Sequence, residues 1–386
     1  MSRTILISEI FPPIHGGSGR WFYELYSRLS PDAIIIAAGT APKASEFDPG
    51  QNLRIYRLDL SSPSWGIKSL RGIRFYLRTL NSVKTILDRE KVNFIHCGRC
   101  IPEGLVGCLL KWLYGIPYIC YVHGEELEFS SLSRELSLLV RMTTRNANLL
   151  ICNSENTRGL LITAFKPDRQ KTAVLHPGVD AHKFIPAPYD IGVRRELGWH
   201  HRPVILTVGR LQQRKGHDML IKALPQIIQA HADVLYAIVG DGEERESLEK
   251  LVGAHQLEAH VMFMSEIEDT KMIQCYQQCT LFVLPNRAVN KDIEGFGMVL
   301  VEAQSCGKPV IAGDSGGTAE TMRVGESGYV IDCTKPEPLA AAIIGILNNP
   351  GLVKEMGNAA RAHIVNHLDW KAHASKASQL FESAKM

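Results

Sequence analysis

The sequence has little net charge and no apolar run that stays free of charge and proline over the length of a membrane span. Its 386 residues carry a net charge of +3, with 45% hydrophobic and 22% charged residues. This composition is ordinary for a folded chain and excludes whole-chain disorder, collagen and coiled coil. We expect residues 101–122, the most apolar stretch, to form a buried helix and then a strand. The first ten residues predict no signal peptide, and we expect a cytoplasmic protein.

The cysteines lack both a pairing pattern and a metal-binding pattern. Nine is an odd number, and several lie in apolar segments, as is typical of reduced, buried thiols rather than disulfides. Cys97 and Cys100 form a CxxC motif, but no second motif or histidine pair completes a zinc site. Asp292 and Glu294 could begin a divalent-metal site, yet nothing nearby completes it. We therefore expect no metal and no other cofactor.

The chain does contain two successive series of short apolar segments separated by helical patterns. The expected strands lie at residues 4–11, 33–38, 94–96, 118–122 and 149–152, and then at 203–208, 235–239, 261–263, 281–284 and 309–312. Apolar strands that alternate with helices predict a parallel sheet covered on both faces. The series restarts after a proline-containing stretch near residues 186–200. We therefore expect two α/β domains, at residues 1–187 and 188–369.

Polar motifs follow several of these strands, at the sheet edge where ligands bind in such folds. Gly209 and Arg210 follow the strand at 203–208, and Lys215 comes five residues after Arg210. An arginine can bind a diphosphate in a planar, bidentate manner and a lysine as a point charge. A solvated basic loop is the structural alternative.

The most informative segment is residues 292–302, DIEGFGMVLVE, which follows the strand at 281–284. Its two glycines, Gly295 and Gly297, allow close backbone approach at the start of a helix expected from Met298 to Cys306. Free N–H groups at that helix start favour a phosphate or sugar oxygen. The carboxylates of Glu294 and Glu302 suit the vicinal hydroxyls of sugars. The alternative places Glu294 as a helix N-terminal charge and Glu302 on the surface.

Two motifs in the first half of the chain also directly follow predicted strands. The loop at residues 15–19, HGGSG, follows the first strand, and Gly16 and Gly17 would let a ligand approach the backbone. The loop lacks GxGxxG spacing, and no acidic residue ends the second strand, so NAD binding is disfavoured. His123 follows the strand at 118–122, where a role in the site and a structural role are both open.

Positive charge is concentrated in the first half. Residues 1–187 contain 23 Lys or Arg and 16 Asp or Glu, a net charge of +7, whereas the rest carries −4. Residues 65–87 form a basic, amphipathic pattern that predicts a helix able to rest on an anionic membrane or simply to face solvent. No nucleic-acid recognition motif accompanies this charge, and we expect no nucleic-acid partner.

Together these motifs resemble the retaining glycosyltransferases of family GT4, whose GT-B fold has two Rossmann-like domains facing across a cleft. The resemblance spans nearly the whole chain and is carried by Gly16-Gly17, His123, Gly209-Arg210, Lys215-Gly216, residues 239–242 (VGDG) and 294–297 (EGFG), and the Glu294-x7-Glu302 spacing. The segment from Asn286-Arg287 to Gly297 is most similar to the phosphatidylinositol mannosyltransferase-like subgroup.

The resemblance implies roles for individual residues. Arg210 and Lys215 would hold the donor diphosphate, Glu302 the nucleotide ribose, and Glu294 the donor-sugar hydroxyls. The remaining assignments are Gly17, with Gly16, against the phosphates, His123 at the sugar, Ser265–Ile267 near the base, and Gly209, Gly295, Phe296, Gly297, Met298 and Val299 around the donor. The acceptor, a lipid-linked sugar or a saccharide, would bind the first domain. The C-terminal helix, within residues 370–386, would cross back onto that domain.

The resemblance favours GDP-mannose as donor and leaves UDP-glucose and UDP-N-acetylglucosamine open. A nucleotide-sugar epimerase of similar architecture is the main alternative enzyme. A non-catalytic partner subunit with a decayed site is a third hypothesis, and the presence of Arg210, Lys215, Glu294 and Glu302 argues against it. The departing phosphate would help to deprotonate the acceptor, since no carboxylate nucleophile is evident.

Overall fold

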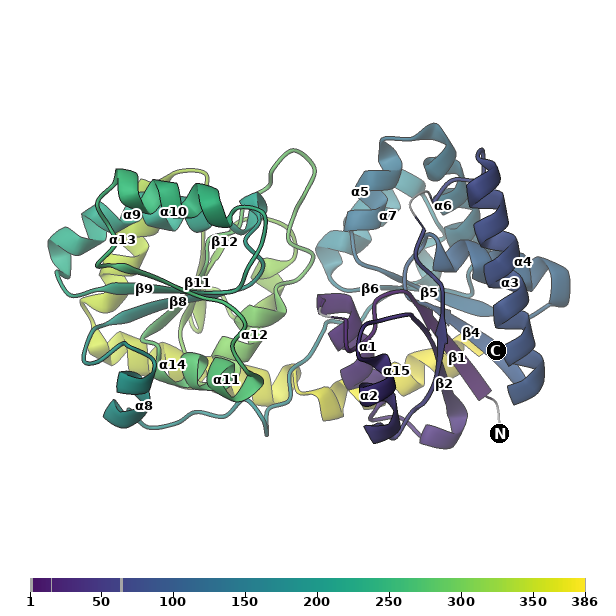
Figure 1. Ribbon diagram of the computed structural model, residues 1–386, viewed down its shortest axis with the longest axis horizontal. Coiled ribbons are helices and arrows are strands. Elements are labelled where there is room, and N and C mark those ends of the chain that lie inside the picture. Colours follow the sequence, from purple (N-terminus) through teal and green to yellow (C-terminus); the bar gives the residue numbers. More distant parts are fainter. Residues whose placement is uncertain (1–2, 15, 63–64, 386) are drawn as a thin grey trace. The chain divides into compact units, whose positions relative to one another are not determined.

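The chain folds into two units in the computed structural model, which describes residues 3–14, 16–62 and 65–385 (Figure 1). The N-terminal unit extends to Pro177 and resumes at Trp370, and the C-terminal unit is Gly178–Asp369. The sequence analysis placed this boundary after residue 187. The two ends of the C-terminal unit lie together, because Val179 and Asp369 form a parallel bridge and the Val179 N–H donates to Leu368 O at 2.9 Å. His15, of the expected glycine loop, and Met386 lie outside the described residues.

The N-terminal unit is built on a seven-stranded sheet in which every pair is parallel. The strand order is β3-β2-β1-β4-β5-β6-β7. The strands are β1 (Arg3–Ser8), β2 (Ile34–Gly39), β3 (Arg54–Leu58), β4 (Val92–Cys97), β5 (Tyr118–Val122), β6 (Leu149–Cys152) and β7 (Thr172–Val174). Strands β2, β5 and β6 are buried along their whole length, which is why they read as continuous apolar runs.

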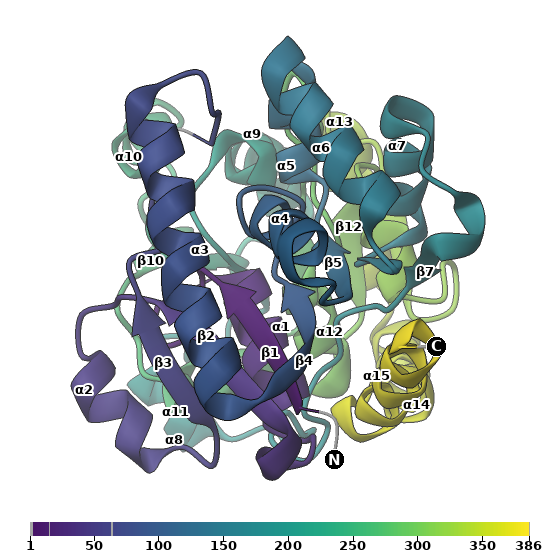
Figure 2. The same ribbon diagram turned by 90° about the vertical axis from the view of Figure 1, so that its right-hand side faces the viewer.

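Helices cover both faces of this sheet. They are α1 (Gly17–Tyr26), α2 (Ala44–Phe47), α3 (Leu70–Glu90), α4 (Glu103–Tyr114), α5 (Glu125–Ser131), α6 (Arg134–Asn146), α7 (Glu155–Phe165) and α15 (Trp370–Lys385). Ile5 and Ile7 of β1 belong to the core shared with α3, α4 and α6, which Figure 2 shows in front of the sheet. On the other face, Tyr26 of α1 and Phe381 of α15 both contact the ring of His96 of β4. The C-terminal helix is therefore part of the N-terminal unit.

The prediction of a helix over residues 65–87 is wrong at its N-terminal end. Helix α3 begins at Leu70, because the Ser69 side chain caps it by accepting a hydrogen bond from the Gly72 N–H at 3.0 Å. The helix then continues to Glu90 and ends at Lys91, which has a left-handed conformation.

The C-terminal unit has a six-stranded parallel sheet in the order β10-β9-β8-β11-β12-β13. Its strands are β8 (Val204–Val208), β9 (Leu235–Val239), β10 (Val261–Met264), β11 (Leu281–Leu284), β12 (Val310–Gly313) and β13 (Gly328–Ile331). Its helices are α8 (Ile191–Glu196), α9 (His217–Ala230), α10 (Arg245–Ala254), α11 (Asp269–Gln278), α12 (Met298–Ser305), α13 (Pro336–Leu347) and α14 (Pro350–His367). Alternate residues of β8 point to opposite faces: Ile205 packs with α9, α10 and α13, and Leu206 with α11, α12 and α14. Figure 1 shows helices on both sides of this sheet.

The prediction of two α/β domains with parallel, doubly covered sheets is confirmed. Strands β3, β7 and β13, which are only partly buried, were missed, and β3 carries two arginines. All nine cysteines are buried and free of disulfides, as expected. Within residues 3–14, 16–62 and 65–385, no helix is both long and apolar enough to span a bilayer.

Candidate active site

The candidate site lies between β8 and β11, where the order in which strands are added to the C-terminal sheet reverses. Strand β8 is followed by β9 on one side, while its other neighbour in the sheet is β11. The loops that follow β8 and β11 therefore leave toward opposite directions, and ligands of open parallel sheets bind in the crevice formed at such a switch point. Lys215 follows β8 and Glu294 follows β11, so the fold brings together two of the expected site residues.

Glycines pin these loops to one another by close backbone contact. Gly216 has φ 74°, and a Cβ there would lie 1.7 Å from the carbonyl oxygen of Pro285. Gly316, after β12, has φ 71°, and a Cβ would lie 1.8 Å from the carbonyl oxygen of Glu294. Any other residue at either position would push the loops apart. The Gly317 N–H also donates to Glu294 O at 3.0 Å, which fixes the backbone of this residue.

Two cations converge on one oxygen of Glu294. Lys215 Nζ and Arg214 Nη1 donate to Glu294 Oε2 at 2.5 and 2.7 Å, and Arg214 Nε lies 3.1 Å from Asp292 Oδ1. Burial would raise the pKa of the Glu294 carboxyl, but the charges of Lys215 and Arg214 and their hydrogen bonds outweigh burial and hold this pKa below its ordinary value. Glu294 is therefore ionised at neutral pH although it is only 8% exposed.

A third cation, Arg287, adjoins the same loops. Its guanidinium donates to both carboxylate oxygens of Asp218, at 2.7 and 3.1 Å. The backbone N–H of Arg287 donates to the carbonyl oxygen of Arg214 at 2.9 Å. Sequence reasoning gave no role to Arg214 or Asp218 and used Arg287 only for the family resemblance. The signal for Arg214 was its place beside Lys215 in a basic loop, but which arginine turns inward depends on the 3₁₀ turn Gln213–Lys215.

Arg210 is placed differently from Lys215. It follows Gly209 directly after β8 and is exposed, and the part of the chain that the structure describes gives its side chain no ion pair. The expected pair of Arg210 and Lys215 therefore appears as one exposed cation and one cation held by Glu294.

Glu302 lies on α12, about one turn after the helix begins at Met298, and is 2% exposed. Its Oε2 accepts a hydrogen bond from the hydroxyl of Tyr276, on α11, at 2.7 Å. The sequence analysis considered a surface position for Glu302 as the alternative, and this burial excludes it. The Glu294-x7-Glu302 spacing places one carboxylate in the loop and the other inside the helix.

The segment between the two glutamates forms the start of α12. Gly297 has φ 93° and precedes Met298, the first helical residue. Phe296 is buried, while Met298 and Val299 are half-buried. Gly295 belongs to the loop that connects Glu294 to this turn. The first-turn N–H groups of α12 thus lie beside Glu294 in the chain, as the motif predicted.

Ser265 and Ile267 follow β10, at the same carboxyl edge of the sheet. Ser265 is exposed, and its hydroxyl accepts a hydrogen bond from Arg245 Nη1 at 2.9 Å. Arg245 in turn lies over the ring of Phe263, 4.4 Å from its centroid. Ile267 packs against the core below the sheet edge.

The remaining expected residues belong to the N-terminal unit. Gly16 and Gly17 mark the start of α1, which follows β1. His123 follows β5, and its Nε2 is 2.8 Å from Gly98 O, after β4. Its ring packs edge-on against Trp21 and Phe22 of α1. These residues therefore all lie at the carboxyl edge of the N-terminal sheet.

Among the residues described, no group of three or more His, Cys, Asp or Glu side chains is arranged to hold a metal ion. The site offers cations, carboxylates and backbone N–H groups instead. Three of the cations, Arg214, Lys215 and Arg287, are paired with the carboxylates of Asp292, Glu294 and Asp218, whereas Arg210 is exposed.

Comparison with known proteins agrees with this geometry. Residues 15–183 match the family model for Glycosyltransferase Family 4, and residues 193–363 match that for Glycosyl transferases group 1. The chain is 30% identical to the GDP-mannose-dependent alpha-(1-6)-phosphatidylinositol monomannoside mannosyltransferase of Mycolicibacterium smegmatis, covering 99% of this chain and 98% of that one. It is 29% identical to the GDP-mannose-dependent monoacylated alpha-(1-6)-phosphatidylinositol monomannoside mannosyltransferase of Corynebacterium glutamicum, covering 99% of this chain and 98% of that one.

Solved structures with the same fold include Anabaena HepE in complex with UDP and glucose, with a TM-score of 0.83, 22% identity and coverage of 99% of this chain and 100% of that one. The sucrose-phosphate synthase of Thermosynechococcus elongatus also has a TM-score of 0.83, with 22% identity and 99% coverage of both chains. The resemblance drawn from the sequence is therefore confirmed. The chain belongs to the family 4 glycosyltransferases of the GT-B fold and is a hexosyltransferase.

Proposed function

We propose that the enzyme transfers mannose from GDP-mannose to a lipid-linked or saccharide acceptor, with retention of configuration at the sugar. The observation that carries this proposal is the 30% identity to a GDP-mannose-dependent mannosyltransferase over 99% of the chain. The paired cations and carboxylates at the switch point of the C-terminal sheet support it, because they suit a diphosphate joined to a sugar.

The chemistry follows from the charges. When the bond between the sugar and the diphosphate breaks, negative charge grows on the departing diphosphate. Lys215 and Arg210 would stabilise that charge, Lys215 from inside the loop and Arg210 from its exposed position. The close contact between Gly216 and the carbonyl oxygen of Pro285 fixes the backbone next to Lys215 before the donor arrives.

Glu294 would accept hydrogen bonds from the sugar hydroxyls. Because its Oε2 already binds Lys215 and Arg214, the same carboxylate that holds the sugar also orients the diphosphate-binding cations. Glu302 would accept hydrogen bonds from the ribose, with Tyr276 fixing the carboxylate. The roles that the resemblance gives to Gly17, His123 and Ser265–Ile267 remain predictions.

We further propose that the reaction needs no metal ion. The cations in the loops after β8 and β11 supply the charge that a divalent ion would otherwise provide. Activity should therefore survive an excess of EDTA, and loss of activity that returns with added magnesium would contradict the proposal.

The surface of the N-terminal unit supports a lipid-linked acceptor at an anionic membrane face. Large apolar side chains are exposed on α3, which also carries exposed arginines. Leu70 is 80% exposed and Leu77 63%, both on α3, with the exposed Arg71 and Arg74 between them. Further exposed apolar residues lie on α4 and in and beside α5 and α6: Trp112, Leu113, Tyr114, Phe129, Leu132 and Leu138. A basic and apolar surface of this kind suits an anionic bilayer.

Co-sedimentation with vesicles tests this surface. Wild-type protein should bind phosphatidylglycerol vesicles and not phosphatidylcholine vesicles, and the double variant Leu70→Gln/Leu77→Gln should bind less. Val365→Gln, on α14 of the C-terminal unit, removes an exposed apolar side chain elsewhere and serves as the control. Equal binding by all three proteins would contradict a membrane role for this surface.

The donor is tested by calorimetric titration with GDP, UDP, GDP-mannose, UDP-glucose and UDP-N-acetylglucosamine. Binding of GDP and GDP-mannose, lost in Arg210→Ala, would support the proposal. Preference for the UDP series would favour the second candidate, a UDP-glucose-type transferase, which the fold shared with UDP-bound HepE supports. Conversion of the donor sugar to its epimer without an acceptor would instead indicate an epimerase.

A further inference from the structure

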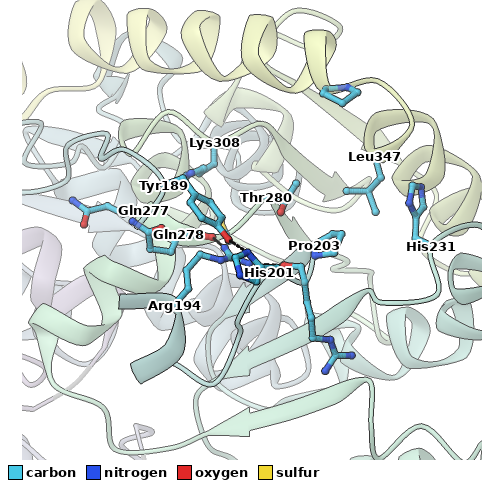
Figure 3. Close-up of a pocket in the computed structure, with 13 residues that line it drawn as sticks. Tyr189, Arg194, His201, Pro203, His231, Gln277, Gln278, Thr280, Lys308 and Leu347 are labelled. Carbon is cyan, nitrogen blue, oxygen red and sulfur yellow. Dashed lines mark hydrogen bonds between the residues drawn. The ribbon is translucent and has the colours of Figure 1, made fainter. Parts of the chain in front are cut away.

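A polar cavity lies at the opposite edge of the C-terminal sheet from the candidate active site (Figure 3). Its volume is about 340 Å³, near the lower limit of about 300 Å³ for small-molecule sites. Its wall is made by residues just before strands: Arg202 and Pro203 before β8, Thr280 before β11 and Lys308 before β12. The site of sugar transfer lies after these strands, so the cavity belongs to a different part of the unit.

The cavity is lined by cations and by no carboxylate among the described residues. Arg194 is 2% exposed, and its guanidinium donates to the carbonyl oxygens of His200, Arg202 and Gln278. Carbonyl groups carry only partial charges, so they satisfy hydrogen bonds without cancelling a full positive charge. Burial lowers the pKa of Arg194, which is the expected effect on a cation in such surroundings.

Arg202 has the same kind of partners. It donates to the carbonyl oxygens of Asp233, Val234 and Ala259 at 2.8–2.9 Å. The Asp233 carboxylate partly offsets the effect of burial on the pKa of Arg202, but it does not line the cavity. Lys308 is half-buried, and its ammonium makes no ion pair within the described part of the chain. The guanidinium of Arg202 is thus held by residues outside the cavity lining, and Arg194 and Lys308 are the cations at the end of the cavity that contains His201.

The two ends of the cavity differ. Figure 3 shows Lys308, Tyr189, His201 and Arg194 gathered at one end, and Leu347 beside His231 at the other. Tyr189 and His201 are held together, because the tyrosine hydroxyl lies 3.0 Å from His201 Nδ1 and the two rings are stacked. The first end offers N–H and O–H donors around cations, and the second offers the aliphatic side chain of Leu347 beside the imidazole of His231.

We propose that this cavity binds a phosphate monoester of a small organic group. The phosphate would lie at the end formed by Lys308, Arg194 and His201, and the organic group would lie toward Leu347. A phosphate supplies several acceptor oxygens and negative charge to a wall that presents mainly donors and positive charge. A carboxylate has fewer oxygens for the same set of donors.

The test uses inorganic phosphate, phenyl phosphate and benzyl alcohol as probes in calorimetric titrations. Phosphates also suit the donor site, so every titration is repeated with Lys215→Ala, which weakens that site and leaves the cavity intact. We expect phenyl phosphate to bind more tightly than phosphate, benzyl alcohol not to bind, and the affinity for phenyl phosphate to be the same in Lys215→Ala.

Lys308→Gln and His201→Gln test the cavity from two positions. Lys308→Gln should weaken phenyl phosphate about tenfold or more, since one charge-assisted bond is lost. His201→Gln should weaken it less. Lys250→Gln makes the same charge change on a side chain of α10 that is 74% exposed, and it should bind as wild type does. Thermal unfolding verifies that each variant is folded.

Two results would overturn the proposal. One is loss of all phenyl phosphate binding in Lys215→Ala, which would assign the binding to the donor site. The other is unchanged affinity in folded Lys308→Gln. Neither result bears on glycosyl transfer itself, because the donor titrations described above test that function separately.

Discussion

Glu294→Gln should tighten the binding of free nucleoside diphosphate while it slows sugar transfer. In the structure Lys215 Nζ and Arg214 Nη1 both donate to Glu294 Oε2, at 2.5 and 2.7 Å. A diphosphate that engages Lys215 must compete with this carboxylate. An amide oxygen keeps a hydrogen-bond acceptor at the same place but removes the charge that holds the lysine.

The magnitude follows from the contacts. A hydrogen bond to a charged group contributes about 1.5–3 kcal/mol. If the diphosphate takes over one such bond, removing the competing charge should tighten nucleotide binding about tenfold or more, at about 1.4 kcal/mol per tenfold. The unliganded variant should be less stable by about 1–3 kcal/mol, because Arg214 and Lys215 lose a buried partner. Added nucleotide should therefore raise the unfolding temperature more in the variant than in wild type.

Calorimetry with the nucleoside diphosphate and thermal unfolding with and without it measure both effects. Asp218→Asn is the matched control, because it removes one negative charge from the same cluster but from a residue that pairs with Arg287. Weaker or unchanged nucleotide binding in Glu294→Gln would refute the competition. If Asp218→Asn tightened nucleotide binding equally, the effect would come from the loss of one negative charge near the site and not from the release of Lys215.

Four further outcomes test the same reasoning. Lys215→Ala should lower kcat more than donor affinity, because Lys215 stabilises charge that develops during the reaction. An equal fall in kcat from kinetics and in donor affinity from calorimetry would indicate that Lys215 binds the ground state and the transition state alike. Tyr276→Phe should weaken nucleotide binding about threefold to tenfold by freeing the Glu302 carboxylate; unchanged affinity would count against the ribose role. Gly216→Ala should destabilise the protein by more than about 2 kcal/mol in denaturant unfolding, since its φ is 74° and a carbonyl lies 1.7 Å from the new Cβ; a neutral result would mean that the loops relax. Burial lowers the pKa of His217 to about 4. As the pH falls from about 6.5 to 4, the unfolded state therefore binds more protons than the folded state, and the free energy of unfolding should decline by up to about 3 kcal/mol. His217→Gln should reduce this pH dependence.

The positions of the strand ends and of Lys215 and Glu294 could be predicted from the sequence, because buried parallel strands and glycine loops are local signals. The role of Arg214 could not. Arg210 and Arg214 are both basic residues in one loop, and only the turn Gln213–Lys215 decides that Arg214 faces Glu294. The hydrogen-bond partner of Glu302 could not be predicted either, because Tyr276 lies 26 positions earlier and contacts Glu302 only through the packing of α11 on α12.

The bridge between Val179 and Asp369 makes the C-terminal unit an insertion within the N-terminal one. The chain enters at residue 178 and leaves at residue 369, and beside these points the Val179 N–H donates to Leu368 O. The segment 178–369 could therefore be expressed alone with its own ends already joined, and a few Gly and Ser residues that connect Pro177 to Trp370 could take its place. Such a shortened protein would keep α15 and Phe381 in its core, whereas one that simply stopped at Pro177 would leave the ring of His96 uncovered.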